Sequence, residues 1–315
     1  MDTYIGLDYG GTKLLIGEVD GQGRLLASRR YDTGRKTQEE AAAYLTECLR
    51  DYREKESFQG TPVAAGIGII GISHREKGIW HSMNHKEGAD IPLAAMVSQI
   101  LQVPAAIDND VRSSTTAELL WGIGKCSRNF VYISVGTGLA AGIVCEGRIL
   151  RGANQNAGEI GHSLVKASSH RQCICGKAGC AELSASGLGM TENMRSRGGG
   201  CMPAREILEK SRQGDSLCRA VREEAEIVLA QVIENLVRTV DPDTVVLGGG
   251  IMQDSFFYEG VKSRLHPATM RGVTGGVRLS SLHPARAGVL GAAAVAKEYI
   301  GLERRKYNEN SNHGK

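Results

Sequence analysis

A histidine and three cysteines lie within a short stretch in the middle of the chain. Cys173 and Cys175 are separated by one residue, four residues separate Cys175 from Cys180, and His162 precedes all three. One imidazole and three thiolates are the ligands of a closed, tetrahedral Zn2+ site, which stabilises structure and leaves no open position for catalysis. Glycines between the cysteines allow the tight bend that such a site needs. We therefore predict a structural zinc loop held by these four side chains.

Two glutamates flank these candidate ligands. Glu159 stands three residues before His162, and Glu182 stands two residues after Cys180. A metal that orders this segment would also fix both carboxylates, which can then accept hydrogen bonds from a polyhydroxylated ligand such as a sugar. The other five of the eight cysteines are scattered singly, as expected of reduced thiols rather than of a disulfide framework. The alternative is a turn-rich segment with ordinary thiols.

A glycine turn with polar residues at its edge lies near the start of the chain. An apolar stretch that ends in an aspartate is followed by a Gly-Gly-Thr-Lys sequence. Backbone N–H groups beside the glycines can face phosphate oxygens, the threonine and lysine can add donors, and the aspartate can hold a hydrated Mg2+. A plain β-hairpin is the alternative, because glycine turns between strands are common. The candidate residues are Asp8, Gly10, Gly11, Thr12 and Lys13.

Three further glycine clusters follow. A second glycine-threonine turn between apolar stretches begins the second half of the chain, and two such hairpins indicate a duplicated fold. Later, a long helical pattern stops at Asp241, and a buried strand then ends in three glycines that leave room for an adenosine. Glycines within residues 66–71 end a core strand and allow either a ligand or a neighbouring strand to come close. The candidate nucleotide-binding residues in the second half are Gly136, Thr137, Gly138, Gly248, Gly249 and Gly250.

A candidate general base follows another short apolar strand. Asp108, Asn109 and Asp110 stand between this strand and a helical pattern. Strand ends of this kind bind ligands in open α/β sheets, and phosphoryl transfer to a hydroxyl needs an acceptor for its proton. Asp110 is our candidate for that acceptor. The alternative is that the three residues only cap the helix, which is an ordinary use of Asp and Asn.

The order of these motifs resembles the ROK family of sugar kinases and sugar-responsive repressors, and its glucokinase and N-acetylhexosamine kinase members in particular. The resemblance rests on Glu-x-Gly-His followed by Cys-x-Cys-Gly-x-x-Gly-Cys-x-Glu, and it covers the chain from Tyr4 to about Tyr299. It implies an α/β, two-lobed actin-like ATPase (ribonuclease H-like) fold with a structural zinc loop. We expect a smaller lobe at residues 1–116, completed by a helix at 287–300, and a larger lobe at 117–286. Residues 301–315 are polar and are expected to form a disordered tail.

The resemblance also implies roles for single residues. Asp110 would be the catalytic base, His162 would bind zinc through one ring nitrogen and the sugar through the other, and the two glycine-threonine turns would hold the ATP phosphates, with Mg2+ near Asp8. The sugar would lie between the lobes. Its expected ligands are Asn84, Asn109, Asp110, Glu159, His162 and Glu182.

Two departures from the family pattern concern the sugar pocket. Val111-Arg112 replaces a small residue followed by an asparagine, so we expect Arg112 to alter the rim of the pocket. Ser73 lies where many relatives have a proline-glycine turn that approaches the sugar. The identity of the sugar therefore stays open.

The implied activity is that of an ATP:hexose 6-phosphotransferase, with glucose as the default substrate. N-acetylmannosamine or N-acetylglucosamine is the alternative substrate, because residues 107–110 and 79–82 are similar to those of N-acetylmannosamine kinases. A non-catalytic sugar sensor and a zinc-stabilised protein-interaction module are alternatives from other classes. The family commonly forms dimers, so we expect a homodimer.

The composition of the chain limits the classes of binding partner that we expect. The 315 residues include 38 basic and 35 acidic ones, and the net charge of +3 gives no global attraction for nucleic acid or an anionic membrane. The chain shows no signal-peptide pattern and no apolar run near the ~18 residues that a membrane span needs. Few residues precede the first strand, whereas ROK repressors carry a DNA-binding domain there. We expect a cytoplasmic protein whose partner is a small-molecule sugar.

Overall fold

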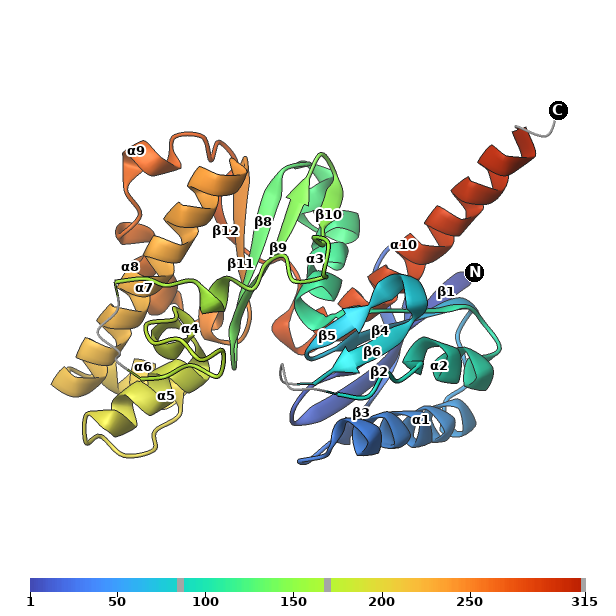
Figure 1. The fold of residues 1–315 in the computed structure, drawn as a ribbon, viewed down its shortest axis with the longest axis horizontal. Helices are drawn as coiled ribbons and strands as arrows, with labels where there is room; N and C mark the ends of the chain where they lie inside the picture. Colours follow the sequence, from blue (N-terminus) through green and yellow to red (C-terminus); the bar gives the residue numbers. More distant parts are fainter. Residues whose placement is uncertain (84–87, 167–170, 313–315) are drawn as a thin grey trace. The chain divides into compact units, whose positions relative to one another are not determined.

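The structure is a computed structural model that describes residues 1–83, 88–166 and 171–312 (Figure 1). The chain forms two compact units. Unit 1 comprises Met1–Gly122 and Ala285–Lys315, and unit 2 comprises Ile123–Pro284. The boundary between the units follows the helix at Asp110–Trp121, whereas the expected boundary at residue 116 lay inside this helix. The helix belongs to unit 1 because it packs on strands of that unit.

Unit 1 is built on a five-stranded sheet with the order β3-β2-β1-β4-β7. β1, β4 and β7 run parallel, whereas β2 and β3 continue the sheet as antiparallel strands. Because parallel strands end at the same edge, the chain leaves β1 and β7 on one side of the sheet. The bounds are β1 (Asp2–Tyr9), β2 (Lys13–Asp20), β3 (Leu25–Asp32), β4 (Thr61–Ile69) and β7 (Ala105–Asn109), and a small hairpin adds β5 (Ile72–His74) and β6 (Ile79–Ser82).

Helices cover both faces of this sheet. Alternate residues of β1, such as Ile5 and Leu7, are buried in one core with Leu45 and Leu49 of α1, and Gly6 between them points to the opposite face. A capping box at Thr37 begins α1. The helices of unit 1 are α1 (Gln38–Lys55), α2 (Leu93–Leu101), α3 (Asp110–Trp121), α10 (Pro284–Asn312) and the 3-10 turn η1 (Arg75–Lys77).

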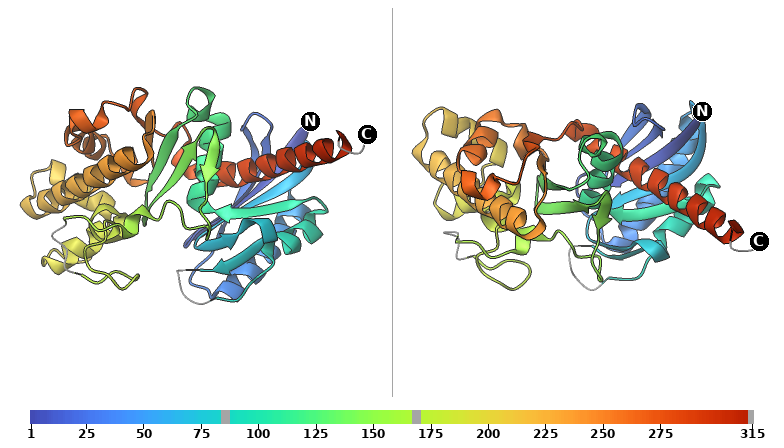
Figure 2. Two further views of the ribbon diagram at one scale, coloured as in Figure 1. Left: turned by 45° about the horizontal axis from the view of Figure 1, so that its top comes forward. Right: turned by 90° about the horizontal axis from the view of Figure 1, so that it is seen from above.

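Helix α10 explains the glycines of the core strands (Figure 2). A Cβ at Gly6 would overlap the carbonyl of Val289, and a Cβ at Gly66 would overlap the carbonyl of Ala292. Gly66 of β4 therefore admits a closely packed helix, whereas Gly71, which follows β4, admits the neighbouring strand β6, because a Cβ there would overlap the carbonyl of Ser82. The helix also continues to Asn312, where a disordered tail had been expected after residue 300. Residues 302–312 contain neither glycine nor proline, so nothing there interrupts a helix.

Unit 2 repeats the design of unit 1. Its sheet has the order β10-β9-β8-β11-β12, with β8, β11 and β12 parallel and β9 and β10 antiparallel. Each sheet thus begins with a hairpin whose first strand pairs with parallel strands, which confirms the duplicated α/β fold. The bounds are β8 (Phe130–Val135), β9 (Leu139–Cys145), β10 (Arg148–Leu150), β11 (Thr244–Gly248) and β12 (Gly276–Leu279).

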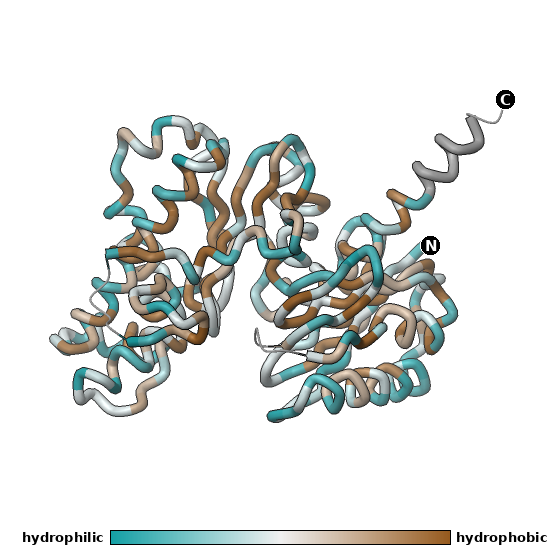
Figure 3. The backbone as a smooth tube through the Cα atoms, viewed as in Figure 1, coloured by the Kyte–Doolittle hydropathy of each residue, from teal (hydrophilic) through white to brown (hydrophobic). Residues whose placement is uncertain are grey.

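The helices of unit 2 pack on this sheet around α7. Asp215 caps the start of α7, and Asp241 ends it in a left-handed conformation with φ 50°, where the sequence predicted the stop. Figure 3 shows apolar residues along the inner strands of this unit. The helices are α4 (Glu182–Ala185), α5 (Gly187–Ser196), α6 (Ala204–Arg212), α7 (Ser216–Val240), α8 (Ser255–Ser263) and α9 (Pro267–Met270), with 3-10 turns η2 (Ile123–Lys125), η3 (Ile160–His162) and η4 (Ile251–Gln253).

A search of the described helices for one long and apolar enough to span a bilayer finds none.

Candidate active site and metal centre

The first turn (residues 10–12) joins β1 to β2, and two of its carbonyl groups accept hydrogen bonds from a residue that follows β3. Thr33, which follows β3, donates its hydroxyl to the Gly10 carbonyl and its N–H to the Thr12 carbonyl, both at 3.3 Å. Because a trans peptide points its N–H opposite its C=O, the N–H of Gly11 points away from Thr33. No atom lies within 4 Å of a Cβ built on Gly11. This turn can therefore offer a backbone donor to an anion.

The second turn (residues 136–138) joins β8 to β9, and the start of α5 binds its carbonyls. Gly187 donates its N–H to Gly136 at 2.8 Å, and Leu188 donates its N–H to Thr137 at 3.2 Å. The N–H groups of Thr137 and Gly138 consequently point away from α5. Within the described residues, neither of these N–H groups has an acceptor. Two neighbouring free N–H groups form the kind of concave donor site that binds phosphate.

Glu182, a predicted sugar ligand, reaches the beginning of β9. Its Oε2 accepts the N–H of Leu139 at 2.9 Å. The same oxygen would lie 2.7 Å from a Cβ on Gly138 and 3.3 Å from a Cβ on Gly161. The glycine at position 138 is thus explained by the carboxylate beside it, and one oxygen of Glu182 is already held by the backbone.

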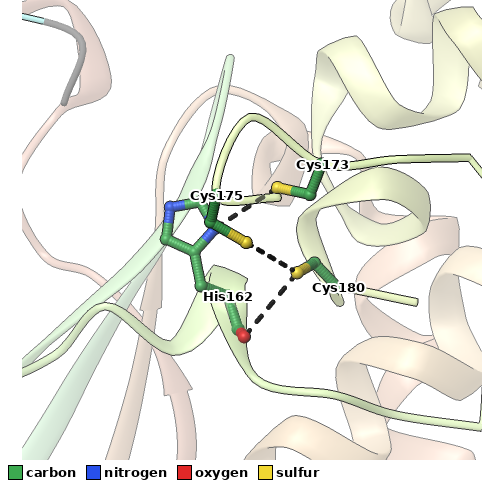
Figure 4. A group of neighbouring side chains, drawn as sticks. All are labelled: His162, Cys173, Cys175 and Cys180. Carbon is green, nitrogen blue, oxygen red and sulfur yellow. Dashed lines mark hydrogen bonds between the residues drawn. The ribbon is translucent and has the colours of Figure 1, made fainter. Parts of the chain in front are cut away.

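The structure brings the four predicted zinc ligands together (Figure 4). Their ligand atoms all lie within 4.8 Å of one another. Cys173 Sγ lies 3.4 Å from His162 Nδ1, and Cys175 Sγ lies 3.4 Å from Cys180 Sγ. Tetrahedral Zn–S bonds of about 2.3 Å place two sulfurs about 3.8 Å apart, so this arrangement fits a zinc ion. The second ring nitrogen of His162 points away from the three sulfurs.

The backbone around these cysteines bends at glycines, as the sequence predicted. Gly176 and Gly179 are left-handed, with φ of 85° and 82°. Burial, and then the hydrogen bond with Cys175, raise the pKa of the Cys180 thiol to about 12. The N–H of Lys177 lowers the pKa of the Cys175 thiol. The Cys180 thiolate therefore needs a cation beside it, as a bound metal would supply.

Two aspartates of unit 1 lie close together at the carboxyl ends of their strands. Asp8 stands near the end of β1, and Asp110 begins α3 directly after β7. Burial and then the charge of Asp110 raise the pKa of Asp8, Lys13 lowers it, and the net result is a pKa of about 7. A Cβ at Gly288 of α10 would overlap the Asp8 carboxylate, so this glycine makes room for it. Oxygen ligands of this type fit Mg2+.

Asn109 does cap α3, as the alternative reading proposed. Its side-chain oxygen accepts the N–H of Val111 at 3.0 Å and that of Arg112 at 3.4 Å, and its Nδ2 donates to the Gly71 carbonyl at 3.2 Å. Asp110 Oδ1 also accepts the N–H of Val111, at 2.9 Å. The capping bonds hold Asn109 and Asp110 in one rigid turn at the end of β7.

The expectation that Arg112 alters the pocket rim is wrong. Arg112 is only 2% exposed, and its Nε donates to Asp108 Oδ1 at 2.8 Å. Asp108 is fully buried and also pairs with Arg75 at 3.1 Å, which in turn pairs with Glu298 of α10 at 2.6 Å. A buried carboxylate requires cationic partners, so Arg112 belongs to the support of the β7–α3 turn.

The remaining predicted residues are placed as follows. Cβ atoms at Gly248 and Gly249 would overlap Tyr132 and the backbone of Val135, so packing explains both glycines. Gly250 has open space around it. Glu159 is half-buried just before η3, and Asn84 lies outside the described residues.

Residues that support the two turns were not predicted. Thr33 carries no motif in the sequence, and Gly288 is one of several small residues in its helix. Thr33 contacts Gly10, and Gly288 lies against Asp8. Both partners are distant in sequence, so no local sequence pattern predicts these contacts.

The two sheets, each with a glycine-threonine turn after its central strand, define a duplicated α/β protein of the actin-like ATPase class. The sequence model of the ROK family matches residues 4–299, and the chain belongs to the ROK family.

Comparison with known proteins gives relatives along nearly the whole chain. The chain is 31% identical over 303 residues to the N-acetylmannosamine kinase of Salmonella typhimurium, covering 94% of this chain and 98% of that one. It is 28% identical over 268 residues to the glucokinase of Halalkalibacterium halodurans, covering 79% and 80%. A ROK family glucokinase from Streptomyces griseus, solved with glucose and AMPPNP, superposes with a TM-score of 0.78 at 25% identity, covering 94% and 99%.

Proposed function

We propose that this protein is an ATP-dependent sugar kinase that phosphorylates the 6-hydroxyl of a hexose, with glucose as the default substrate. One observation carries the proposal. Asp110 directly follows β7, and the sheet register places the last residue of β7, Asn109, level with Tyr9 at the end of β1, so that the charge of Asp110 raises the pKa of Asp8. A candidate base therefore lies beside a candidate phosphate site. The relatives named as glucokinase and N-acetylmannosamine kinase support this reading.

Asp110 acts as the general base in this proposal. Its carboxylate accepts the proton of the sugar hydroxyl while the hydroxyl oxygen forms a bond to the γ-phosphorus of ATP. The bond between that phosphorus and the bridging oxygen breaks, and ADP leaves with the electron pair. Asn109 keeps the base in place through its bonds to the first N–H groups of α3.

The free N–H groups of the two turns bind the phosphates of ATP. Thr12, Lys13 and Thr137 add side-chain donors, and the open space at Gly250 accommodates part of the adenosine. Asp8 would hold Mg2+, which when bound offsets the charge on the phosphates. With a pKa of about 7, Asp8 is partly protonated at neutral pH, so a cation beside it favours its ionised form.

Asn109, Glu159, His162 and Glu182 supply hydrogen bonds to the sugar, and Asn84 remains a predicted ligand. Zinc would hold His162 in one orientation, which would leave the second ring nitrogen of His162 to donate to a sugar hydroxyl. An N-acetylated hexosamine is the alternative substrate, and the similarity to an N-acetylmannosamine kinase over 94% of this chain favours it.

A coupled ADP-release assay tests the proposal. Zinc-loaded protein with Mg-ATP is assayed against hexoses, N-acetylhexosamines and β-glucosides. We expect one sugar to give turnover that Asp110→Asn lowers by about 10³-fold while sugar binding persists. Asp32→Asn, at an exposed carboxylate that ends β3, is the matched control and should keep full activity. Sugar binding without any turnover would instead identify a non-catalytic sugar sensor.

A further inference from the structure

We propose that the metal loop positions the second turn, so that metal occupancy sets the affinity of this turn for nucleotide phosphates. The metal loop is defined as the described residues 158–166 and 171–182, which contain the four ligands. The inference rests on the proposed role of the second turn in ATP binding. It lies entirely within unit 2.

The first connection runs through Glu182. This residue starts α4 only two residues after the ligand Cys180, whose carbonyl accepts the N–H of Leu183 at 3.1 Å. Its Oε2 binds the N–H of Leu139, which is the residue after the second turn, at 2.9 Å. Movement of Cys180 therefore moves a carboxylate that holds one end of the turn.

The second connection runs from α4 to the first residues of α5. The hydroxyl of Ser186 donates to the Glu182 carbonyl at 2.8 Å, and its oxygen accepts the N–H of Gly189 at 2.9 Å. This serine thereby joins the end of α4 to the start of α5. Gly187 and Leu188, the first two residues of α5, donate their N–H groups to the carbonyls of the turn. The orientation of the free N–H groups thus depends on the position of α4.

The third connection is direct packing of the segment before His162 on β9. Gly158 accepts the N–H of Ala141 at 2.8 Å, and Gly161 lies so close to Leu139 that a Cβ would overlap its carbonyl. Gly161 precedes the ligand His162 and belongs to the same 3-10 turn. Both ends of the metal loop therefore contact the first residues of β9.

These three connections predict reciprocal coupling between metal and nucleotide. Without the metal, the four ligand side chains are no longer held by one ion. The helix α4 and the start of α5 then lose their fixed position relative to β9. A turn whose carbonyls are no longer bound can rotate its N–H groups away from a phosphate. By linkage, any factor by which zinc tightens nucleotide binding must also be the factor by which nucleotide tightens zinc binding.

Titration calorimetry with AMPPNP and Mg2+, without sugar, tests the coupling. We expect AMPPNP to bind about tenfold more weakly after treatment with a zinc-selective chelator than in the zinc-loaded protein. The affinity for Zn2+, measured by competition with a chromophoric chelator, should rise by the same factor when AMPPNP is present. Equal AMPPNP affinity with and without zinc would overturn the inference. Zinc-loaded protein that binds no AMPPNP would instead overturn the proposed kinase function.

A variant separates the coupling from simple unfolding of the metal-free protein. A Cβ at Gly187 would lie 2.9 Å from the Gly136 carbonyl oxygen, so Gly187→Ala should displace α5 from the turn without contacting a metal ligand. In the zinc-loaded state we expect about fivefold weaker AMPPNP binding with unchanged zinc affinity in the absence of nucleotide. Glu192→Ala, at an exposed ion pair on the same helix, is the control and should change neither affinity.

Ser186→Ala provides a milder variant if Gly187→Ala does not fold, as judged by circular dichroism. It removes the hydroxyl that joins α4 to α5 and adds no atoms, so we expect a smaller loss of AMPPNP affinity in the same direction. Unchanged AMPPNP affinity in a folded, zinc-loaded variant at either position would overturn the route through α5.

Discussion

The two glycine-threonine turns occupy equivalent places in the two sheets but are supported in different ways. In the first turn, the single residue Thr33 binds the carbonyls of Gly10 and Thr12. In the second turn, the start of α5 and the carboxylate of Glu182 share this task. Among the described residues, only the second support is continuous with the cluster of His162 and three cysteines. The coupling proposed above would let a duplicated fold keep the same turn in both halves while just one of them depends on a bound ion.

Removal of the metal should produce the largest difference in local stability between the two turns. A metal that holds four side chains contributes its binding free energy to local folding. After chelation, we expect amide exchange to accelerate on the order of 100-fold in the described metal loop and the first residues of α5. Exchange in the first turn, β1 and β2 should stay unchanged. Hydrogen exchange with mass spectrometry measures both regions in one sample, and equal acceleration in both would refute the difference.

Crowding the Asp8 carboxylate should damage the surroundings of the first turn alone. The methyl group of Gly288→Ala would overlap this carboxylate, and overpacking of this kind costs about 1–3 kcal/mol. We expect a lower midpoint of chemical denaturation and reduced turnover, with unchanged affinity for zinc. Gly301→Ala, in the same helix with no atom within 4 Å of the new Cβ, is the matched control and should not destabilise the protein.

The raised pKa of Asp8 predicts a pH dependence confined to unit 1. Its pKa is about 7 in the folded protein and 3.8 as the reference value for the unfolded chain, so the folded state binds more protons between these values. Stability contributed by this group therefore falls as pH rises through that window. Asp8→Asn should be more stable than the parent protein at pH 8 and should lose this advantage near pH 4. Thermal denaturation in magnesium-free buffer measures the difference, and a constant offset across pH would contradict the assignment.

Loss of the Thr33 hydroxyl should have the smallest effect. Thr33→Val keeps the shape of the side chain but removes the bond to the Gly10 carbonyl, which is worth about 1 kcal/mol. We expect roughly fivefold weaker AMPPNP binding. Zinc affinity should not change, in contrast to the reciprocal coupling expected for the second turn. Thr33→Ser retains the hydroxyl and should bind AMPPNP like the parent protein; a loss equal to that of Thr33→Val would show that the methyl group matters instead.

The sequence by itself determined the features that depend on neighbours along the chain. The spacing of Cys173, Cys175 and Cys180 predicted that these thiols would lie together, because side chains that are close in sequence can meet within one short loop. The two glycine-threonine turns predicted a duplicated fold, and Asp241 marked the end of α7. Each of these patterns is local, so the residue types and their spacing are enough to predict the local structure.

Only the tertiary structure decided which distant groups meet. Gly66 faces a helix rather than a ligand, because the topology returns α10 to the sheet of unit 1. Arg112 is buried against Asp108 instead of facing a pocket, and Thr33 binds the turn at Gly10. A strand position shows which face a residue occupies, but the partner on that face depends on the path of the whole chain. Contacts between segments far apart in sequence therefore decide how the two turns are supported.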